Sequence, residues 1–88
     1  MSQQDTLLEF PCEFPLKIMG PTRPDFAEAI CAVVAEHAPG FDAGRMEMRA
    51  SSGGNYISLT CTVTATSKQQ LDDLYRALSA HPMVKVVL

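Results

Sequence analysis

The segment Lys17-Ile18-Met19-Gly20-Pro21-Thr22-Arg23-Pro24-Asp25-Phe26 decides the fold, because it leads a strand through a turn into a helix. Before Gly20, apolar residues occupy every second position from residue 14 onward, which is typical of a strand with one buried face. After it, Thr22 and Asp25 have the spacing of a capping box, whose side chains bind free amides of a first helical turn. Pro24 fits that turn, where a missing N–H costs nothing. We therefore predict a strand over residues 14–20 and a capped helix directly after it.

The middle of the chain continues with two strands. The first helix is predicted to end at Pro39-Gly40. A second strand is predicted over residues 45–49, with its two methionines pointing inward. The glycine-rich segment 51–55 predicts a hairpin loop into a third strand over residues 56–65, where apolar and hydroxyl side chains alternate strictly.

The last third of the chain predicts a helix and a closing strand. Ser67 and Gln70 form a second capping-box pattern, and a helical apolar stripe follows it. His81-Pro82 should end this helix, and residues 83–88 should form the last strand. The element order is therefore β-α-β-β-α-β.

This order predicts an α+β protein with the ferredoxin-like, split-βαβ architecture. Each helix has one apolar stripe, so both should cover the same face of a four-stranded antiparallel sheet with strand order 4-1-3-2. With 88 residues the chain has room for one domain. We place that domain at residues 13–88, after an N-terminal arm over residues 1–12.

The opposite face of the sheet is expected to be open and locally basic. Strand alternation places four of the seven basic residues there, against one of the ten acids, although the net charge of the chain is −3. Exposed strand faces are normally polar because water covers them, so this composition needs no ligand. The alternative is that the face binds an anionic ligand or an acidic partner. The candidate partner-binding residues are Lys17, Arg45, Arg49, Tyr56 and Lys85.

An RNA-binding role for this face is an alternative with less support. RNA-recognition domains stack bases on aromatic side chains of the central strands, and here Tyr56 is the one aromatic residue expected to face outward. The segment 54–58 does not match the usual RNA-binding pattern of such a strand. We therefore do not expect nucleic acid as the partner.

The first loop is the candidate ligand site. A glycine lets the backbone approach another group closely, and a helix N-terminus favours anions. The candidate ligand-binding residues are Gly20, Thr22, Arg23 and Asp25. The alternative is that these residues serve as a capped connector, in which case Thr22 and Asp25 already occupy the free amides.

The sequence offers no pattern for catalysis, a metal or a cofactor, and we expect none of them. His37 and His81 each lie near a predicted helix C-terminus, where a histidine favours the helix dipole, and their spacing does not suit a metal pair. Cys31 has no adjacent base in sequence, so a catalytic thiol is not expected. The chain shows neither a signal peptide nor an apolar run of the roughly 20 residues that cross a bilayer, so we expect a cytoplasmic protein and no membrane partner. A small enzyme or an accessory factor of a metabolic pathway is the alternative reading.

The last strand should lie at an edge of the sheet. Its residues are apolar except Lys85, which is the one obvious charged residue that would disfavour pairing with another chain. An edge-to-edge homodimer is therefore one expectation, and coverage by the N-terminal arm is the other.

Residues 17–26 resemble the start of an ACT domain, in the form strand-Gly-x-x-Arg-Pro-Asp-helix. ACT domains are regulatory modules that dimerise through sheet edges and bind amino acids at this first loop. The present sequence has Asp25 where many of them place a glycine.

A second resemblance, to the YbeD-like family of small bacterial proteins, covers nearly the whole chain. The segments that carry it are Leu7-Leu8-Glu9-Phe10-Pro11, Met19-Gly20 with Lys17, His37-Ala38-Pro39-Gly40, Gly54-Asn55-Tyr56 with Ser51-Ser52, Leu74-Tyr75 and Val87-Leu88. This resemblance implies an ACT-like fold and a regulatory or allosteric role, and it brings no catalytic residues. The expected function is a non-enzymatic regulatory module that binds a small molecule or a protein partner.

Overall fold

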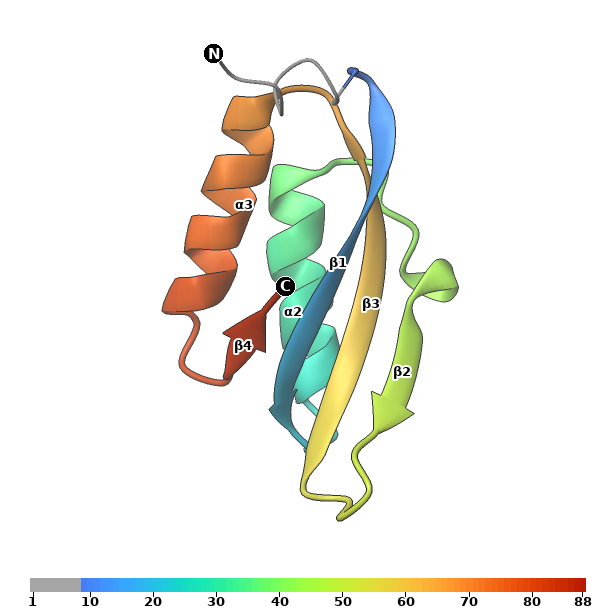
Figure 1. Ribbon diagram of the computed structural model, residues 1–88, viewed down its shortest axis with the longest axis vertical. Helices are drawn as coiled ribbons and strands as arrows, with labels where there is room; N and C mark the ends of the chain where they lie inside the picture. The colour runs from blue at the N-terminus through green and yellow to red at the C-terminus, as the bar shows by residue number, and fades with distance from the viewer. Residues whose placement is uncertain (1–8) are drawn as a thin grey trace.

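The computed structural model describes residues 9–88, which form a two-layer α+β sandwich (Figure 1). The four strands are antiparallel and lie in the order β2-β3-β1-β4, which confirms the predicted order 4-1-3-2. The first eight residues of the predicted N-terminal arm lie outside the described part. The elements are β1 (Cys12–Pro21), α2 (Phe26–His37), a 3-10 helix (Ala43–Arg45), β2 (Glu47–Ala50), β3 (Tyr56–Ala65), α3 (Lys68–Ala80) and β4 (Val86–Val87).

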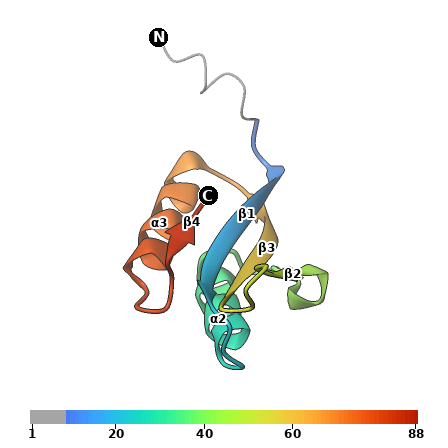
Figure 2. The same cartoon turned by 60° about the horizontal axis from the view of Figure 1, so that its bottom comes forward.

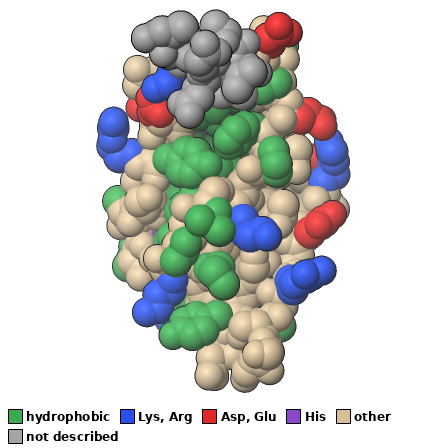
Figure 3. Space-filling view, viewed as in Figure 1, with side chains coloured by type: hydrophobic (Ala, Val, Ile, Leu, Met, Phe, Trp, Pro, Cys, Tyr) green, Lys and Arg blue, Asp and Glu red, His purple; other side chains and the backbone are tan. Residues whose placement is uncertain are grey.

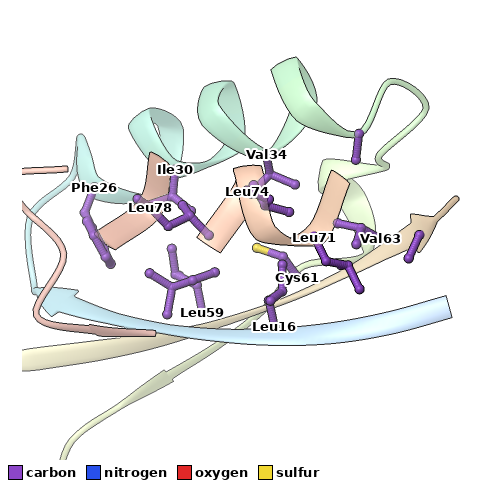
Figure 4. Close-up of a cluster of buried hydrophobic side chains, with 13 residues drawn as sticks. Leu16, Phe26, Ile30, Val34, Leu59, Cys61, Val63, Leu71, Leu74 and Leu78 are labelled. Carbon is purple, nitrogen blue, oxygen red and sulfur yellow. The ribbon is translucent and has the colours of Figure 1, made fainter. Parts of the chain in front are cut away.

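Both helices cover one face of the sheet, as the single apolar stripe on each of them predicts (Figures 1 and 2). The core lies between this face and the helices, where the side chains that Figure 4 labels converge. Within residues 9–88, neither helix has the length and apolar character that a membrane-spanning helix needs. The fully or almost fully buried residues are Leu16, Ile18, Phe26, Ile30, Val34, Ala38, Leu59, Cys61, Val63, Ala65, Leu71, Leu74 and Leu78.

The two long central strands set the register of the sheet. Leu16 pairs with Cys61 and Ile18 pairs with Leu59, so the buried positions of β1 and β3 coincide. The predicted alternation in both strands is confirmed. Since antiparallel partners point to the same face, the remaining positions of these strands form the open face.

The start of α2 differs from the prediction. Asp25 is the N-cap residue, but its side chain makes no capping bond, so the predicted capping box is wrong. Its carboxylate instead accepts two hydrogen bonds of 3.1 Å from the guanidinium of Arg23. Thr22 lies three residues before the cap, and its N–H donates to the carbonyl of Asn55 at 3.2 Å. The Thr22 amide and the Asp25 carboxylate therefore each bond to a residue outside the predicted capping pair, which the spacing of Thr22 and Asp25 does not reveal.

The start of α3 agrees with the prediction. The Ser67 hydroxyl accepts a hydrogen bond from the N–H of Gln70 at 3.1 Å. The Gln70 side-chain oxygen reaches back to the N–H of Thr66 at 2.6 Å, one residue before the cap. Its side-chain nitrogen donates to the carbonyl of His37 at 2.9 Å, which joins the start of α3 to the end of α2.

The second strand is shorter than predicted and less covered. Arg45 belongs to the 3-10 helix, and β2 begins at Glu47. Met46 does point inward, with its sulfur 3.7 Å from the thiol of Cys31 on α2. Met48 pairs with Leu59 and therefore lies on the helix side, yet it is 60% exposed, because β2 extends beyond the two helices (Figure 2). The predicted inward direction of Met48 is therefore confirmed, although the side chain is not buried.

The last strand is shifted relative to the prediction. Strand parity predicts Met83, Lys85 and Val87 on the open face. Val87 instead pairs with Ile18 and Val86 with Met19, so Val87 faces the helices and Val86 faces outward. The N–H of Lys85 also donates to the carbonyl of Met19, at 2.7 Å. Two residues of this strand therefore lie opposite one residue of β1, which is the pattern of a β-bulge. The bulge lets Lys85 and Val86 share the open face and places Leu88 there as well.

Candidate functional site

The open face of the sheet brings together four of the five residues predicted to bind a partner, and the register shows how. One row across the sheet runs from Leu88 through Lys17 and Thr60 to Glu47. The next row runs from Val86 through Met19 and Ser58 to Arg49. Tyr56 follows at the end of β3, and the Lys85 ammonium lies 5.8 Å from the centre of its ring, within the range of a cation–π contact.

Three cations on this face are free of nearby carboxylates. Within the described part of the chain, no carboxylate lies within 4.0 Å of the charged groups of Lys17, Arg49 or Lys85. An unpaired cation that is neither neutralised nor buried can bind an incoming anion without first breaking an internal pair. These three side chains are therefore the available basic groups of the face.

The fourth predicted cation, Arg45, is partly neutralised. Its guanidinium lies 3.5 Å from the carboxylate of Glu13. The sequence analysis missed Glu13 because it began the first strand at residue 14, whereas β1 begins at Cys12. The open face thus has two acids, Glu13 and Glu47, and its basic character centres on β1, β2 and β4 away from Arg45.

The open face also presents apolar side chains, of which Met19 and Tyr56 are predicted there by alternation and Val86 and Leu88 are not. Val86 is 43% exposed, Leu88 is 65% exposed and Tyr56 is 42% exposed, and half-buried Met19 lies between them. Figure 3 shows hydrophobic side chains in a band down the middle of this face, with Lys and Arg side chains on both sides. Every residue from 83 to 88 except Lys85 is apolar. The pattern of polar and apolar residues therefore gives no reliable sign of which of them face outward.

The surface of this face is hollowed at several places, two of which differ in polarity. One, of about 530 Å³, is lined by residues of three strands and has mostly polar walls. Its lining residues are Lys17, Glu47, Met48, Arg49, Ser58 and Thr60. The other, of about 260 Å³, is mostly apolar and lies between Met19, Tyr56 and Lys85. The face can therefore receive both charged and apolar groups of a partner.

The first loop is held by internal contacts. A Cβ atom at Gly20 would overlap the ring of Phe26 and lie 2.6 Å from the carbonyl oxygen of Met83, so the close approach that this glycine allows is made by the protein itself. The side chains of Arg23 and Asp25 pair with each other and are more than half exposed. Thr22 is tied through its backbone to the hairpin loop. Ligand binding by these residues stays a prediction.

The two cysteines of the core region, Tyr75 and His81 are held by burial or by hydrogen bonds within the protein. Burial raises the pKa of the Cys31 thiol and raises that of Cys61 to about 12, with a smaller contribution from Cys31 to the latter. Both thiols therefore stay protonated and are poor nucleophiles. Burial likewise raises the pKa of the Tyr75 hydroxyl. His81 accepts a hydrogen bond from the N–H of Met83 at 3.2 Å. Across residues 9–88, no three His, Cys, Asp or Glu side chains are grouped as metal ligands.

The fold and the open face define a small ferredoxin-like α+β protein with an ACT-like arrangement of two helices on a four-stranded sheet. The chain belongs to the family described as "Protein of unknown function (DUF493)", whose model matches residues 5–88. The resemblance to YbeD-like proteins is thereby confirmed.

Relatives of similar length support this assignment. A UPF0250 protein of Paraburkholderia phytofirmans is 61% identical over 99% of this chain and 98% of its own. A UPF0250 protein of Ralstonia nicotianae is 60% identical over 97% of this chain and 88% of its own. A UPF0250 protein of Nitrosomonas europaea is 48% identical over 97% of this chain and 98% of its own.

Two solved structures share the fold. The solution structure of protein HP0495 from H. pylori matches with a TM-score of 0.74 and 13% identity, over 92% of this chain and 85% of that one. The C-terminal domain of the MgtC protein from Mycobacterium tuberculosis matches with a TM-score of 0.62 and 16% identity, over 92% of this chain and 88% of that one. At these identities the likeness concerns the fold.

Proposed function

We propose that this protein is a non-enzymatic regulatory module that binds a protein partner through the open face of its sheet. One observation carries the proposal: exposed Tyr56, Val86 and Leu88 lie on the same face as Lys17 and Arg49, two cations without an ion pair among residues 9–88. Single exposed apolar residues are ordinary, but a group of them with a charged border is typical of a protein-binding surface.

The two kinds of side chain have different roles in such an interface. Burial of apolar surface provides most of the affinity, at roughly 25 cal/mol per Å² removed from water. The cations attract an acidic partner before contact and reject basic ones, so they set the association rate and the choice of partner. Tyr56 combines an apolar ring with a hydroxyl, which is common among the residues that dominate binding energy.

A photo-crosslinking experiment in cells tests the proposal. A benzophenone amino acid replaces Leu88 on the open face, and in a matched variant it replaces Arg76 on α3, whose side chain is 78% exposed. We expect irradiation to join the first variant to a second protein, and to leave the Arg76 variant without that product. Adding Lys17→Glu and Arg49→Glu should remove the product.

The outcome that would overturn the proposal is equally definite. If position 88 gives no adduct, or if positions 88 and 76 give the same adducts, then the open face has no specific protein partner. Recovery of the chain as a folded protein, checked by circular dichroism, excludes unfolding as the cause.

A further inference from the structure

We infer that the partner presents an amphipathic α-helix with acidic residues beside its apolar stripe, and that this helix lies lengthwise over β1 and β4. The inference rests on the proposed function and adds the conformation and the charge of the segment that binds. It follows from the backbone pairing, the size and the charge of the open face.

The backbone pairing decides the conformation of the partner segment. The N–H and C=O groups of a sheet lie in its plane, and here those of Lys17 are bonded to Leu88 while the carbonyl of Met19 accepts from Lys85. A segment lying on the face therefore finds no backbone partners and must satisfy its own polar groups. An α-helix does so internally, whereas an extended segment would have to leave the face and pair at an edge.

The apolar band is made of Met19, Tyr56, Val86 and Leu88, and its dimensions agree with those of a bound helix. From Lys17, whose partner is Leu88, to Pro21, whose partner is Tyr56, the band runs four residues along β1. At about 3.3 Å per residue this is about 13 Å, or between two and three helical turns. Adjacent strands lie about 4.8 Å apart, so a helix about 10 Å wide covers two of them. The helices α2 and α3 cover the other face of the same sheet in the same way (Figure 1).

The charges decide the composition of that helix and argue against a second copy of this chain. Arg49 on β2 lies beside the apolar band, the Lys85 ammonium lies over the ring of Tyr56 within it, and Lys17 also lies within it. A helix with acidic residues beside its apolar stripe matches this pattern. In a two-fold symmetric dimer formed face to face, the same patch would contact itself, so these cations would approach cations.

Peptide selection tests the inference on the whole chain. The probe is a displayed library of helix-forming peptides about 14 residues long, which is about 21 Å of helix. We expect enriched peptides to combine Leu, Ile or Phe at helical spacing with flanking Asp or Glu. On addition of one synthesised peptide, the backbone amide NMR signals of Lys17, Met19 and Val86 should shift, and the peptide should gain helical circular dichroism.

Matched charge reversals give the control. Lys17→Glu with Arg49→Glu should weaken the selected peptide at least about tenfold, since each close charge pair lost becomes a repulsion. Lys68→Glu with Arg76→Glu makes the same change of charge on the exposed side of α3 and should leave the affinity unchanged. Leu88→Ala should also weaken binding while the NMR spectrum stays that of a folded chain.

Four results would overturn the inference. They are a selection without specific binders, enrichment of basic peptides, signal changes confined to the amides of β2 at the sheet edge, and a dimer in sedimentation equilibrium that the Lys17→Glu change disrupts. If crosslinking at position 88 succeeds and the crosslinked segment binds as an extended strand, the proposed function stands while this inference fails. Anionic phospholipid vesicles binding in place of acidic peptides would overturn both.

Discussion

On one face of the sheet, Leu16, Ile18 and Leu59 are fully buried beneath α2 and α3, whereas on the other Tyr56, Val86 and Leu88 are exposed beside basic side chains. The first face provides the stability of the domain because its apolar surface is removed from water. The second contributes exposed apolar groups that folding does not need. With the proposed function, stability and binding are divided between two sides of the same strands.

The largest effect should come from the helix-covered face. Leu59→Ala removes a fully buried side chain and should lower the free energy of unfolding by about 2–5 kcal/mol. Its pairing partner Met48 lies on the same side of the sheet but is 60% exposed, so Met48→Ala should cost no more than about 0.5 kcal/mol. Urea unfolding of both variants measures the difference. Equal losses would mean that β2 is covered in solution.

The junction between β1 and α2 should be the next most sensitive point. Gly20→Ala places a Cβ against the ring of Phe26 and the carbonyl of Met83, so we expect a loss of about 1–3 kcal/mol. Gly53→Ala is the matched control, because the nearest atom to its new Cβ is 3.7 Å away in the side chain of Asn55. Thermal unfolding should separate the two by several degrees. If Gly20→Ala were neutral, the first loop would be open enough to hold a ligand.

The buried thiol makes stability depend on alkaline pH. Cys61 has a raised pKa of about 12 in the folded chain and an ordinary value of 9.0 when unfolded. Above that lower value the unfolded thiol loses its proton while the folded one keeps it. The free energy of unfolding should therefore be constant below it and fall above it, by about 1.4 kcal/mol per pH unit. Cys61→Ala should reduce this slope to the part due to Cys31 and Tyr75, whose pKa values burial also raises, whereas Cys12→Ala should keep it, in urea titrations across the alkaline range.

Substitutions at the starts of α3 and α2 should lower the free energy of unfolding by amounts that differ by about one capping hydrogen bond. Ser67→Ala removes the hydroxyl that accepts from Gln70 and should cost about 1 kcal/mol. Asp25→Asn weakens an exposed ion pair with Arg23 and should cost no more than about 0.5 kcal/mol. Chemical denaturation provides the comparison. An equal or larger loss at Asp25 would show that its carboxylate caps α2 in solution.

The smallest effect on stability should come from the basic side chains of the open face. Lys17→Glu and Arg49→Glu change exposed groups that form no ion pair within residues 9–88 and should alter the free energy of unfolding by less than about 0.5 kcal/mol. The same pair of changes should abolish partner crosslinking. A large loss of stability would show that these cations belong to the folded framework and would remove the division between the two faces.

The sequence analysis predicted most of the fold because its strongest signals are local. The strict alternation in residues 56–65, the helical stripe after Ser67 and the breaks at Pro39-Gly40 and His81-Pro82 each follow from near neighbours in the chain. It failed where a distant contact won. The carbonyl of Asn55 accepts from the amide of Thr22, and the bulge at Lys85 reverses the alternation of the last strand. The pairing of Asp25 with Arg23 is a local contact that competes with capping and that the capping-box spacing does not reveal.

For the candidate site, the sequence correctly placed Lys17, Arg49, Tyr56 and Lys85 on the open face. It also placed Met19 there, but it assigned the wrong apolar residues of the last strand to this face. Strand parity predicts Val87 beside Lys85 on the open face, whereas Val87 faces the helices. The pairing of Val86 with Met19 is what turns Val86 and Leu88 outward.

The sequence by itself therefore determined the order of the elements, the faces of the two long strands and the positions of the basic residues. Periodicity and helix-ending residues act over a few positions and need no partner. Only the tertiary structure decided which apolar residues of β4 face outward, which cations are paired and how far the helices cover β2. Those outcomes depend on hydrogen bonds and packing between segments far apart in the chain, which no local pattern specifies.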